Sequence, residues 1–172
     1  VSNLSSSRAL RDVTQAHDCQ YTAAAVGEVN VVTQMKATNA VIGGEGNGGV
    51  IYPPLHYGRD ALVGVALFLT LLAKSGKKVS ELKKTYPQYS IAKNKIQLTP
   101  DIDVDKILVK VKEHFASEKI TDIDGVKIDF ADSWVHLRKS NTEPIIRIYS
   151  EAETMEKAEA LAEEMKGIIA SL

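Results

Sequence analysis

Apolar and polar positions in the first half of the chain predict alternating helices and strands. Three short apolar runs suit buried strands, because each is bounded by glycine or polar residues and is too short for a helix. Asp60 precedes a long apolar run that ends at Ser75 and Gly76, which is typical of a capped helix. The expected strands are 20–26, 40–42 and 50–52, and the expected helices follow Ser5-Ser6-Ser7 and span 29–39, 60–75 and 80–86. This alternation indicates an α/β domain, in which helices are layered on a mixed, mainly parallel sheet.

The second half has a different pattern, which predicts a helix, three strands and a final helix. Apolar residues with helical spacing run from Val104 to Phe115. Residues 126–130 alternate apolar and charged side chains like a half-buried strand, and 134–137 and 145–149 suit two further strands. From Met155 to Ile169 the chain has its strongest amphipathic helix pattern. We therefore expect a smaller α+β domain with an antiparallel sheet.

A change in charge separates the two halves. Residues 1–90 carry nine Lys and Arg against six Asp and Glu, whereas residues 91–172 carry twelve against sixteen. Pro87 interrupts the hydrophobic pattern near the same point. The sequence therefore predicts two domains, 1–90 and 91–172, with a hinge at about 87–95. Because Val1 stands close to the first helix, we expect the first domain to begin inside a larger protein.

Composition limits the class of protein. With 172 residues, 44% hydrophobic and 25% charged, the chain suits a soluble globular protein. The longest apolar run, 61–73, is too short to span a membrane, so we expect a buried helix with other elements covering both its faces. The net charge of -1 gives no bulk attraction to nucleic acid or to a membrane. A single cysteine, Cys19, cannot form an internal disulfide, which favours a cytoplasmic protein.

The most unusual segment is Gly43-Gly44-Glu45-Gly46-Asn47-Gly48-Gly49. It formally matches the dinucleotide fingerprint GxGxxG, but that fingerprint needs a helix where this chain has a strand-like run and Pro53-Pro54. One alternative is a tight hairpin. The other is a sugar site, because glycines let a ligand approach the backbone closely. In such a site Glu45 would accept hydrogen bonds from hydroxyls, and Asn47 would both donate and accept them.

Other polar residues of the first half give weaker signals. His56 stands before Tyr57-Gly58-Arg59-Asp60 at a helix start, where a capping loop and a ligand-binding loop remain equally open. None of the four histidines has the paired spacing of a metal site. The triplet Asn3-Leu4-Ser5 fits a glycosylation sequon, to which we give no weight because no secretory signal precedes it.

A polar loop is expected between two strands of the second half. It concentrates two cations, two hydroxyls and one amide in five consecutive residues: Arg138, Lys139, Ser140, Asn141 and Thr142. Arg147 on the next strand can add a third cation. An arginine binds phosphate as a bidentate fork, and hydroxyls with backbone N–H groups complete an anion site. A phosphate loop and a solvated polar turn both remain open.

Together the two loops resemble the α-D-phosphohexomutase family, which includes phosphoglucomutase, phosphomannomutase and phosphoglucosamine mutase. The resemblance covers nearly the whole chain but only the C-terminal part of a four-domain enzyme, with 1–90 similar to the third domain and 91–172 to the fourth. The matching segments are Val26-Gly27-Glu28, residues 43–49, Gly58-Arg59-Asp60 and residues 138–144. The Gly-Glu-Gly-Asn-Gly-Gly form is most similar to bacterial phosphoglucosamine or phosphomannose mutases.

This resemblance implies an intramolecular phosphotransferase that interconverts hexose 1-phosphates and 6-phosphates through a phosphoserine and a bisphosphorylated sugar, with the help of Mg²⁺. Many relatives have Ser at the position of Asn47, which leaves the identity of the sugar open. The implied sugar-binding residues are Glu45, Gly46, Asn47 and Gly48, with His56 and Arg59 as further candidates. The implied phosphate-binding residues are Arg138, Ser140, Asn141 and Thr142, with Arg147 as a further candidate.

Two motifs of the family do not occur in this sequence: Ser-His-Asn-Pro, which carries the nucleophile, and Asp-Gly-Asp-x-Asp-Arg, which binds magnesium. We therefore expect no catalytic residue and no metal site in this chain, and Mg²⁺ only in the full-length parent. The expected partners are hexose phosphates and the missing N-terminal domains of the same enzyme. The alternative from another class is a non-catalytic sugar-phosphate-binding or partner module.

Overall fold

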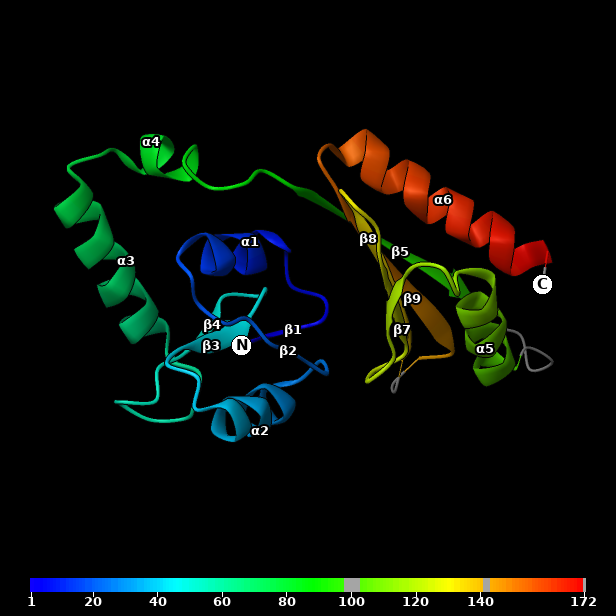
Figure 1. The fold of residues 1–172 in the computed structure, drawn as a ribbon, viewed down its shortest axis with the longest axis horizontal. Coiled ribbons are helices and arrows are strands. Elements are labelled where there is room, and N and C mark those ends of the chain that lie inside the picture. The colour runs from blue at the N-terminus through cyan, green and yellow to red at the C-terminus, as the bar shows by residue number, and fades with distance from the viewer. Residues whose placement is uncertain (98–102, 141–142, 172) are drawn as a thin grey trace. The chain divides into compact units, whose positions relative to one another are not determined.

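The chain forms two compact units, Val1–Gln88 and Tyr89–Leu172 (Figure 1). This computed structural model describes residues 1–97, 103–140 and 143–171. Each unit has a hydrophobic core of its own, made of residues from that unit alone. The two units are therefore described separately.

The first unit builds one mixed sheet. Strand β1 pairs in parallel with β2 and with β3, and β4 is antiparallel to β3, which gives the order β2-β1-β3-β4. The mixed, mainly parallel sheet expected from the sequence is thus confirmed, and α1 and α2 lie on opposite sides of it (Figure 1). In chain order the elements are β1 (Ser2–Asn3), α1 (Ala9–Ala16), β2 (Ala23–Ala24), α2 (Glu28–Thr38), β3 (Gly43–Glu45), β4 (Gly49–Ile51), α3 (Ala61–Ser75) and α4 (Val79–Lys83).

The third strand lies three residues later than the apolar pattern predicts. Residues 40–42 form no strand, and Val41 is 77% exposed. The glycine-rich segment that starts at Gly43 takes the place in the sheet instead. A side chain at Gly43 would collide with the Met35 thioether, so the glycine lets α2 pack closely on β3. Hydrophobic pattern cannot detect such a strand, because glycine ordinarily weakens strands and supplies no side chain to count. The strand expected over 20–26 is also shorter, and β2 contains two residues only.

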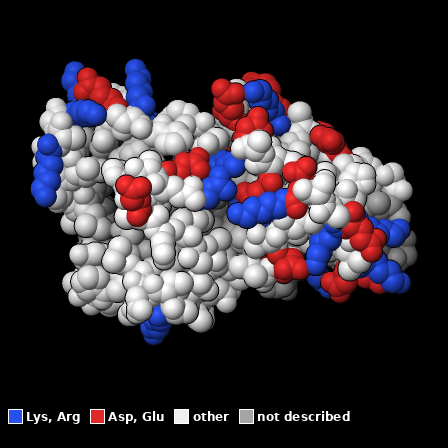
Figure 2. All heavy atoms as spheres, in the orientation of Figure 1, with Lys and Arg blue, Asp and Glu red and all other residues white. Residues whose placement is uncertain are grey.

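Helix α3 has the expected ends but not the expected surroundings. The Asp60 carboxylate accepts a hydrogen bond from the Val63 N–H (3.0 Å), and Gly76 ends the helix in the left-handed conformation. No residue of α3 is buried, however, and Leu62 is 81% exposed. The prediction that both faces are covered is therefore wrong for this chain. Figure 2 shows few charged side chains over the first unit in this view. Among the described residues, no helix is long and apolar enough to cross a membrane.

The second unit is an antiparallel sheet with the strand order β5-β9-β8-β7-β6. The antiparallel sheet is confirmed, but β5 and β6 are absent from the sequence prediction, and β5 occupies part of the segment predicted as a hinge. Alternating lysines hide β5, because charged side chains are common on edge strands. The elements are β5 (Ser90–Gln97), α5 (Val104–His114), β6 (Lys119–Thr121), β7 (Val126–Asp129), β8 (Trp134–Lys139), β9 (Ile145–Ala152) and α6 (Met155–Ser171).

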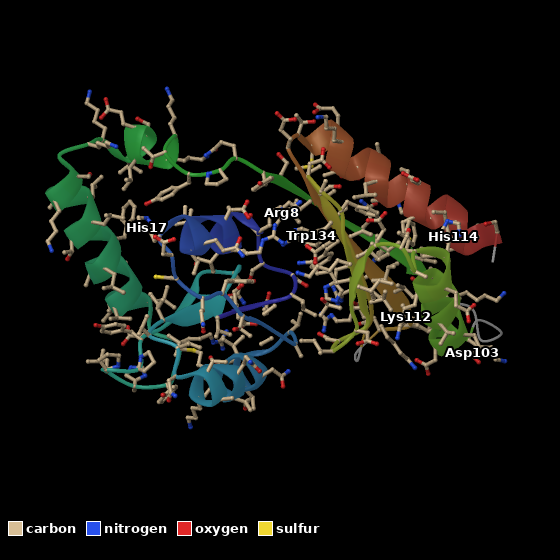
Figure 3. The ribbon with its side chains drawn as sticks, viewed as in Figure 1. Arg8, His17, Asp103, Lys112, His114 and Trp134 are labelled. Carbon is tan, nitrogen blue, oxygen red and sulfur yellow. The ribbon has the colours of Figure 1, made fainter. Side chains whose placement is uncertain are left out.

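Both helices of the second unit cover the same face of this sheet (Figure 1). Val111 of α5 and Met165 of α6 belong to one buried cluster that includes Val135 and Leu137 of β8. Asp103 caps α5 by accepting a hydrogen bond from the Lys106 N–H, and it lies at the start of that helix in Figure 3. Because successive residues of a strand point to opposite faces, the side chains between these core positions lie on the other face of β8. That face carries the cations considered below.

Candidate functional site

The glycine-rich segment forms a tight hairpin between β3 and β4. Glu45 pairs with Gly49, and a loop of three residues joins the two strands. The Gly48 N–H donates to the Glu45 carbonyl (3.1 Å), and Gly48 has a φ of 93°, which glycine adopts at little cost. The Asn47 Oδ1 accepts a hydrogen bond from the Gly49 N–H (3.2 Å). Two backbone donors of the predicted sugar site, those of Gly46 and Gly48, therefore already have partners inside the protein.

Glu45 is a buried carboxylate, and one of its two oxygens accepts two hydrogen bonds from the protein. Its side chain is 7% exposed. Oε1 accepts hydrogen bonds from Asn3 Nδ2 (2.9 Å) and from the Gly27 N–H (3.3 Å). Oε2 lies 3.9 Å from Nη1 of Arg59. Burying a carboxylate is costly unless it is paired or hydrogen-bonded, and these contacts meet that requirement while leaving Oε2 with the weaker partner.

Arg59 is held beside Glu45 by the start of α2. Glu28 accepts from the Arg59 Nε through Oε2 (2.7 Å) and from the Arg59 backbone N–H through Oε1 (3.2 Å). Both carboxylate oxygens of Glu28 are used in this way, so the guanidinium has a defined position. An open depression of about 610 Å³ adjoins it, lined by Glu28, Asn47, Gly48, Gly49, Gly58, Arg59 and Ala61. The structure thus brings Glu45, Asn47 and Arg59 together.

His56 fixes the loop before α3. Its Nδ1 accepts a hydrogen bond from the Gly58 N–H (3.0 Å), so in the neutral ring Nε2 carries the proton that faces Asp60 Oδ2 at 3.1 Å. The hydrogen bond from the Val63 backbone, with a smaller contribution from His56, holds the pKa of Asp60 below its usual value. Both ring nitrogens of His56 are therefore engaged within the loop.

Of the residues predicted to bind phosphate, Arg138 lies in β8, Ser140 directly follows that strand, and Arg147 lies in β9. Arg138 is directly opposite Arg147 in the strand register, and Ser140 is buried with its N–H donating to the Ile145 carbonyl (3.0 Å). Asn141 and Thr142 lie outside the described residues. The Arg147 Nη2 contacts Glu143 Oε2 at 2.8 Å, whereas Arg138 Nε is 3.9 Å from Asp124 Oδ2.

A third cation extends this pair. Lys95 of β5 is directly opposite Arg147 on its other side, so Lys95, Arg147 and Arg138 form a row across three strands. Paired residues of neighbouring strands share a face of the sheet, and this row lies on the face opposite the helices. Lys95 is not predictable from the hydrophobic pattern, because the segment that contains it has the polar character expected of a hinge. The signal available in the sequence is the alternation of Lys93 and Lys95 with smaller residues, which is typical of an edge strand.

Two further residues of this site are not predicted by the sequence: Asn3 and Ser6, which contact Glu45 and Gly46. In the sequence, Asn3 stands out only as part of a glycosylation sequon. The available signal is a run of polar residues at the carboxyl end of a strand in a parallel sheet, because ligands bind at such ends. Among the described residues, no group of three or more His, Cys, Asp and Glu side chains could hold a metal ion.

Comparison with known proteins places these residues in a family. Residues 1–89 match the α/β/α domain III of phosphoglucomutase/phosphomannomutase, and residues 90–168 match the C-terminal domain of the same family. The phosphoglucosamine/phosphogalactosamine mutase of Sulfurisphaera tokodaii is 39% identical over 171 residues, which cover 98% of this chain and 38% of that protein. The phosphoglucomutase/phosphomannomutase of Thermococcus kodakarensis is 41% identical over 160 residues, which cover 92% of this chain and 35% of that protein.

A solved structure has the same fold. The phosphoglucomutase/phosphomannomutase family protein of Burkholderia thailandensis superposes with a TM-score of 0.77 at 22% identity, over 98% of this chain and 36% of that one. The chain thus spans little more than a third of the length of the proteins it matches. On the strength of both sequence matches, the chain belongs to the phosphoglucomutase/phosphomannomutase family and comprises its domain III and its C-terminal domain.

Proposed function

We propose that this chain supplies sugar and phosphate recognition in a phosphohexomutase whose complete form interconverts hexose 1-phosphates and 6-phosphates. The observation that carries the proposal is the buried Glu45 carboxylate, which has one oxygen saturated and the other directed toward Arg59. A protein that only needed a hairpin here would gain nothing from a buried charge. Oε2 of Glu45, the amide of Asn47 and the guanidinium of Arg59 together offer an acceptor and donors to sugar hydroxyls.

The second part of the proposal concerns the phosphate that does not react. Arg138 and Arg147 provide two planar guanidinium groups, each able to bind phosphate through two hydrogen bonds. Lys95 adds a point charge to the same row. Ser140, Asn141 and Thr142 are proposed to complete the loop with hydroxyl and amide groups. In a reaction that passes through a bisphosphorylated sugar, such a group of cations would hold whichever phosphate is distant from the nucleophile.

The chemistry of phosphoryl transfer is proposed to lie outside this chain. The sequence contains neither the nucleophile motif nor the magnesium motif of the family. The residues present do not fit a Mg²⁺ site, since the described part of the chain has no cluster of metal-ligating side chains. An Aspergillus fumigatus N-acetylphosphoglucosamine mutase has been solved with GlcNAc-6P and magnesium, which supports a magnesium requirement for the complete enzyme. We also place the protein in the cytoplasm, because its only cysteine is exposed and free.

Titration of the 172-residue chain with glucose 6-phosphate and with inorganic phosphate, followed by NMR, tests the proposal. Glu45→Ala should weaken glucose 6-phosphate binding by about tenfold or more and leave inorganic phosphate binding unchanged. Arg138→Ala should weaken both ligands, because a charged fork is lost. Lys139→Ala is the matched control, since its exposed side chain lies on the other face of β8. Unchanged affinity for glucose 6-phosphate in both Glu45→Ala and Arg138→Ala would contradict the proposal.

A further inference from the structure

Two buried polar side chains, Asn3 at the end of β1 and Ser6 shortly after it, connect that strand to the hairpin of Glu45 and Asn47. Asn3 is 6% exposed and Ser6 is 5% exposed. The register of β1 and β3, in which Ser2 pairs with Gly44, places Asn3 beside Glu45. Neither residue was assigned a role by the family resemblance. Buried polar groups are almost always hydrogen-bonded, so the polar side-chain atoms of Asn3 and Ser6 should each have an identifiable partner.

The amide of Asn3 can adopt only one orientation. Its Oδ1 accepts from the Ser6 hydroxyl (2.9 Å) and from the Ser5 backbone N–H (3.1 Å). Because these two donors approach the same side of the Asn3 amide, the amide oxygen must lie on that side. The Nδ2 group must then face Glu45. Nδ2 then donates to Oε1 of Glu45 at 2.9 Å.

The hydroxyl of Ser6 extends the same chain of hydrogen bonds. The Ser6 hydroxyl donates its proton to Asn3, so its lone pairs are available as acceptors. It accepts a hydrogen bond from the Gly46 N–H at 2.9 Å. Gly46 stands between Glu45 and Asn47, so this bond fixes the peptide that joins the two proposed sugar ligands. A Cβ at Gly46 would lie 3.3 Å from Ser6 Cα and Oγ, which shows how closely the two segments approach.

We propose that Asn3 and Ser6 are positioning residues for sugar recognition. Asn3, with the Gly27 N–H, occupies Oε1 of Glu45 and so leaves Oε2 as the one oxygen that accepts from a sugar hydroxyl. Ser6 holds the Gly46 peptide and thereby the direction in which Asn47 points. This inference rests on the proposed function of Glu45. It adds a second layer of residues that act on the sugar through Glu45 and Asn47 and never touch it.

A double-mutant cycle on the 172-residue chain tests the proposal, with glucose 6-phosphate as the ligand. Asn3→Ala and Ser6→Ala should each weaken its binding by about tenfold while inorganic phosphate binding stays within twofold. Ser7→Ala is the matched control, because its hydroxyl accepts the Ala9 N–H in the first turn of α1 and the change should alter neither affinity. In a Glu45→Ala background, Asn3→Ala should cause no further loss, because a residue that acts through Glu45 has nothing left to position.

An NMR measurement that leaves Asn3 in place tests the proposal even if the Asn3 variant folds poorly. In Glu45→Gln the acceptor of the Asn3 side-chain amide loses its charge, so the NMR signals of that amide should move upfield. Unmoved Asn3 signals, or losses that add fully across the cycle, would overturn the positioning role. If Glu45→Ala keeps the parental affinity, the proposed function fails and this inference fails with it. If Glu45→Ala loses affinity but Asn3→Ala and Ser6→Ala do not, the positioning inference alone is overturned.

Discussion

Arg138 and Arg147 occupy directly opposite positions on neighbouring strands of the second unit. Like charges at such positions repel, and each arginine is offset by a different carboxylate, Asp124 or Glu143. The contact from Arg138 is long, at 3.9 Å, so the repulsion is only partly relieved. An anion bound between the two guanidinium groups would relieve it further, which links the stability of this unit to phosphate.

Inorganic phosphate should therefore stabilise the second unit, and Arg147→Gln should reduce that stabilisation. Without phosphate the variant should differ from the parent by no more than about 1 kcal/mol, because the relief of the like-charge repulsion is offset by the loss of the ion pair with Glu143. Thermal unfolding followed by Trp134 fluorescence, with and without phosphate, measures both effects. Lys157→Gln, an exposed change on α6, is the control. Equal stabilisation by phosphate in the parent and in Arg147→Gln would count against the cation row as its site.

Acid should destabilise the second unit through His136. Burial of the ring lowers the pKa of His136 below its ordinary value of 6.5, although the hydrogen bond to the Asp124 carbonyl opposes this shift. Between that lowered pKa and 6.5 the unfolded chain binds more protons than the folded chain, so stability falls as the pH decreases through this window. Above pH 6.5 the effect is absent.

Chemical unfolding at several pH values, followed by Trp134 fluorescence, checks the prediction for His136. His136→Gln should lose this part of the pH dependence. His114→Gln is the control, since His114 is an exposed residue at the end of α5 (Figure 3). A pH dependence that is the same in parent and His136→Gln would show that another group is responsible.

The two units should unfold as separate cooperative bodies. Met35 is fully buried in the core of the first unit, and Met165 is buried in the core of the second. Each methionine-to-alanine change should cost about 2–5 kcal/mol in its own unit. Trp134, the only tryptophan, reports on the second unit, and the Ile51 methyl signals report on the first. If Met35→Ala shifts the Trp134 transition as much as the Ile51 transition, the units are not independent.

The 172-residue chain should show no mutase activity. Without a phosphoserine no covalent relay is possible, and without metal ligands the charge of the transferring phosphoryl group is not neutralised. A coupled assay with glucose 1-phosphate and Mg²⁺ measures the turnover. Any turnover that persists after repeated purification and disappears in Arg138→Ala would refute this prediction.

Some parts of the fold follow directly from the sequence, and others do not. The ends of α3 were predictable because Asp60 and Gly76 act on the backbone next to them. The location of β3 was not, because it depends on how closely Met35 approaches a glycine that has no side chain of its own to count. The same division applies to the site. The glycine loop and Arg138 are recognisable locally, whereas Asn3, Ser6 and Lys95 acquire their partners only when the sheets bring together residues that are 42, 40 and 52 positions apart.

The exposed leucines of α3 also bear on how this chain fluctuates. A helix of 15 residues is marginal on its own in water, and most helical stability in proteins comes from packing. Since no residue of α3 is buried, this helix gains little from packing and depends on its caps and its intrinsic propensity. Local opening of α3 should therefore cost less free energy than opening of α2. In a hydrogen-exchange experiment on the chain, the backbone amides of α3 should exchange with deuterium well before those of α2, whose Val31 and Met35 are fully buried.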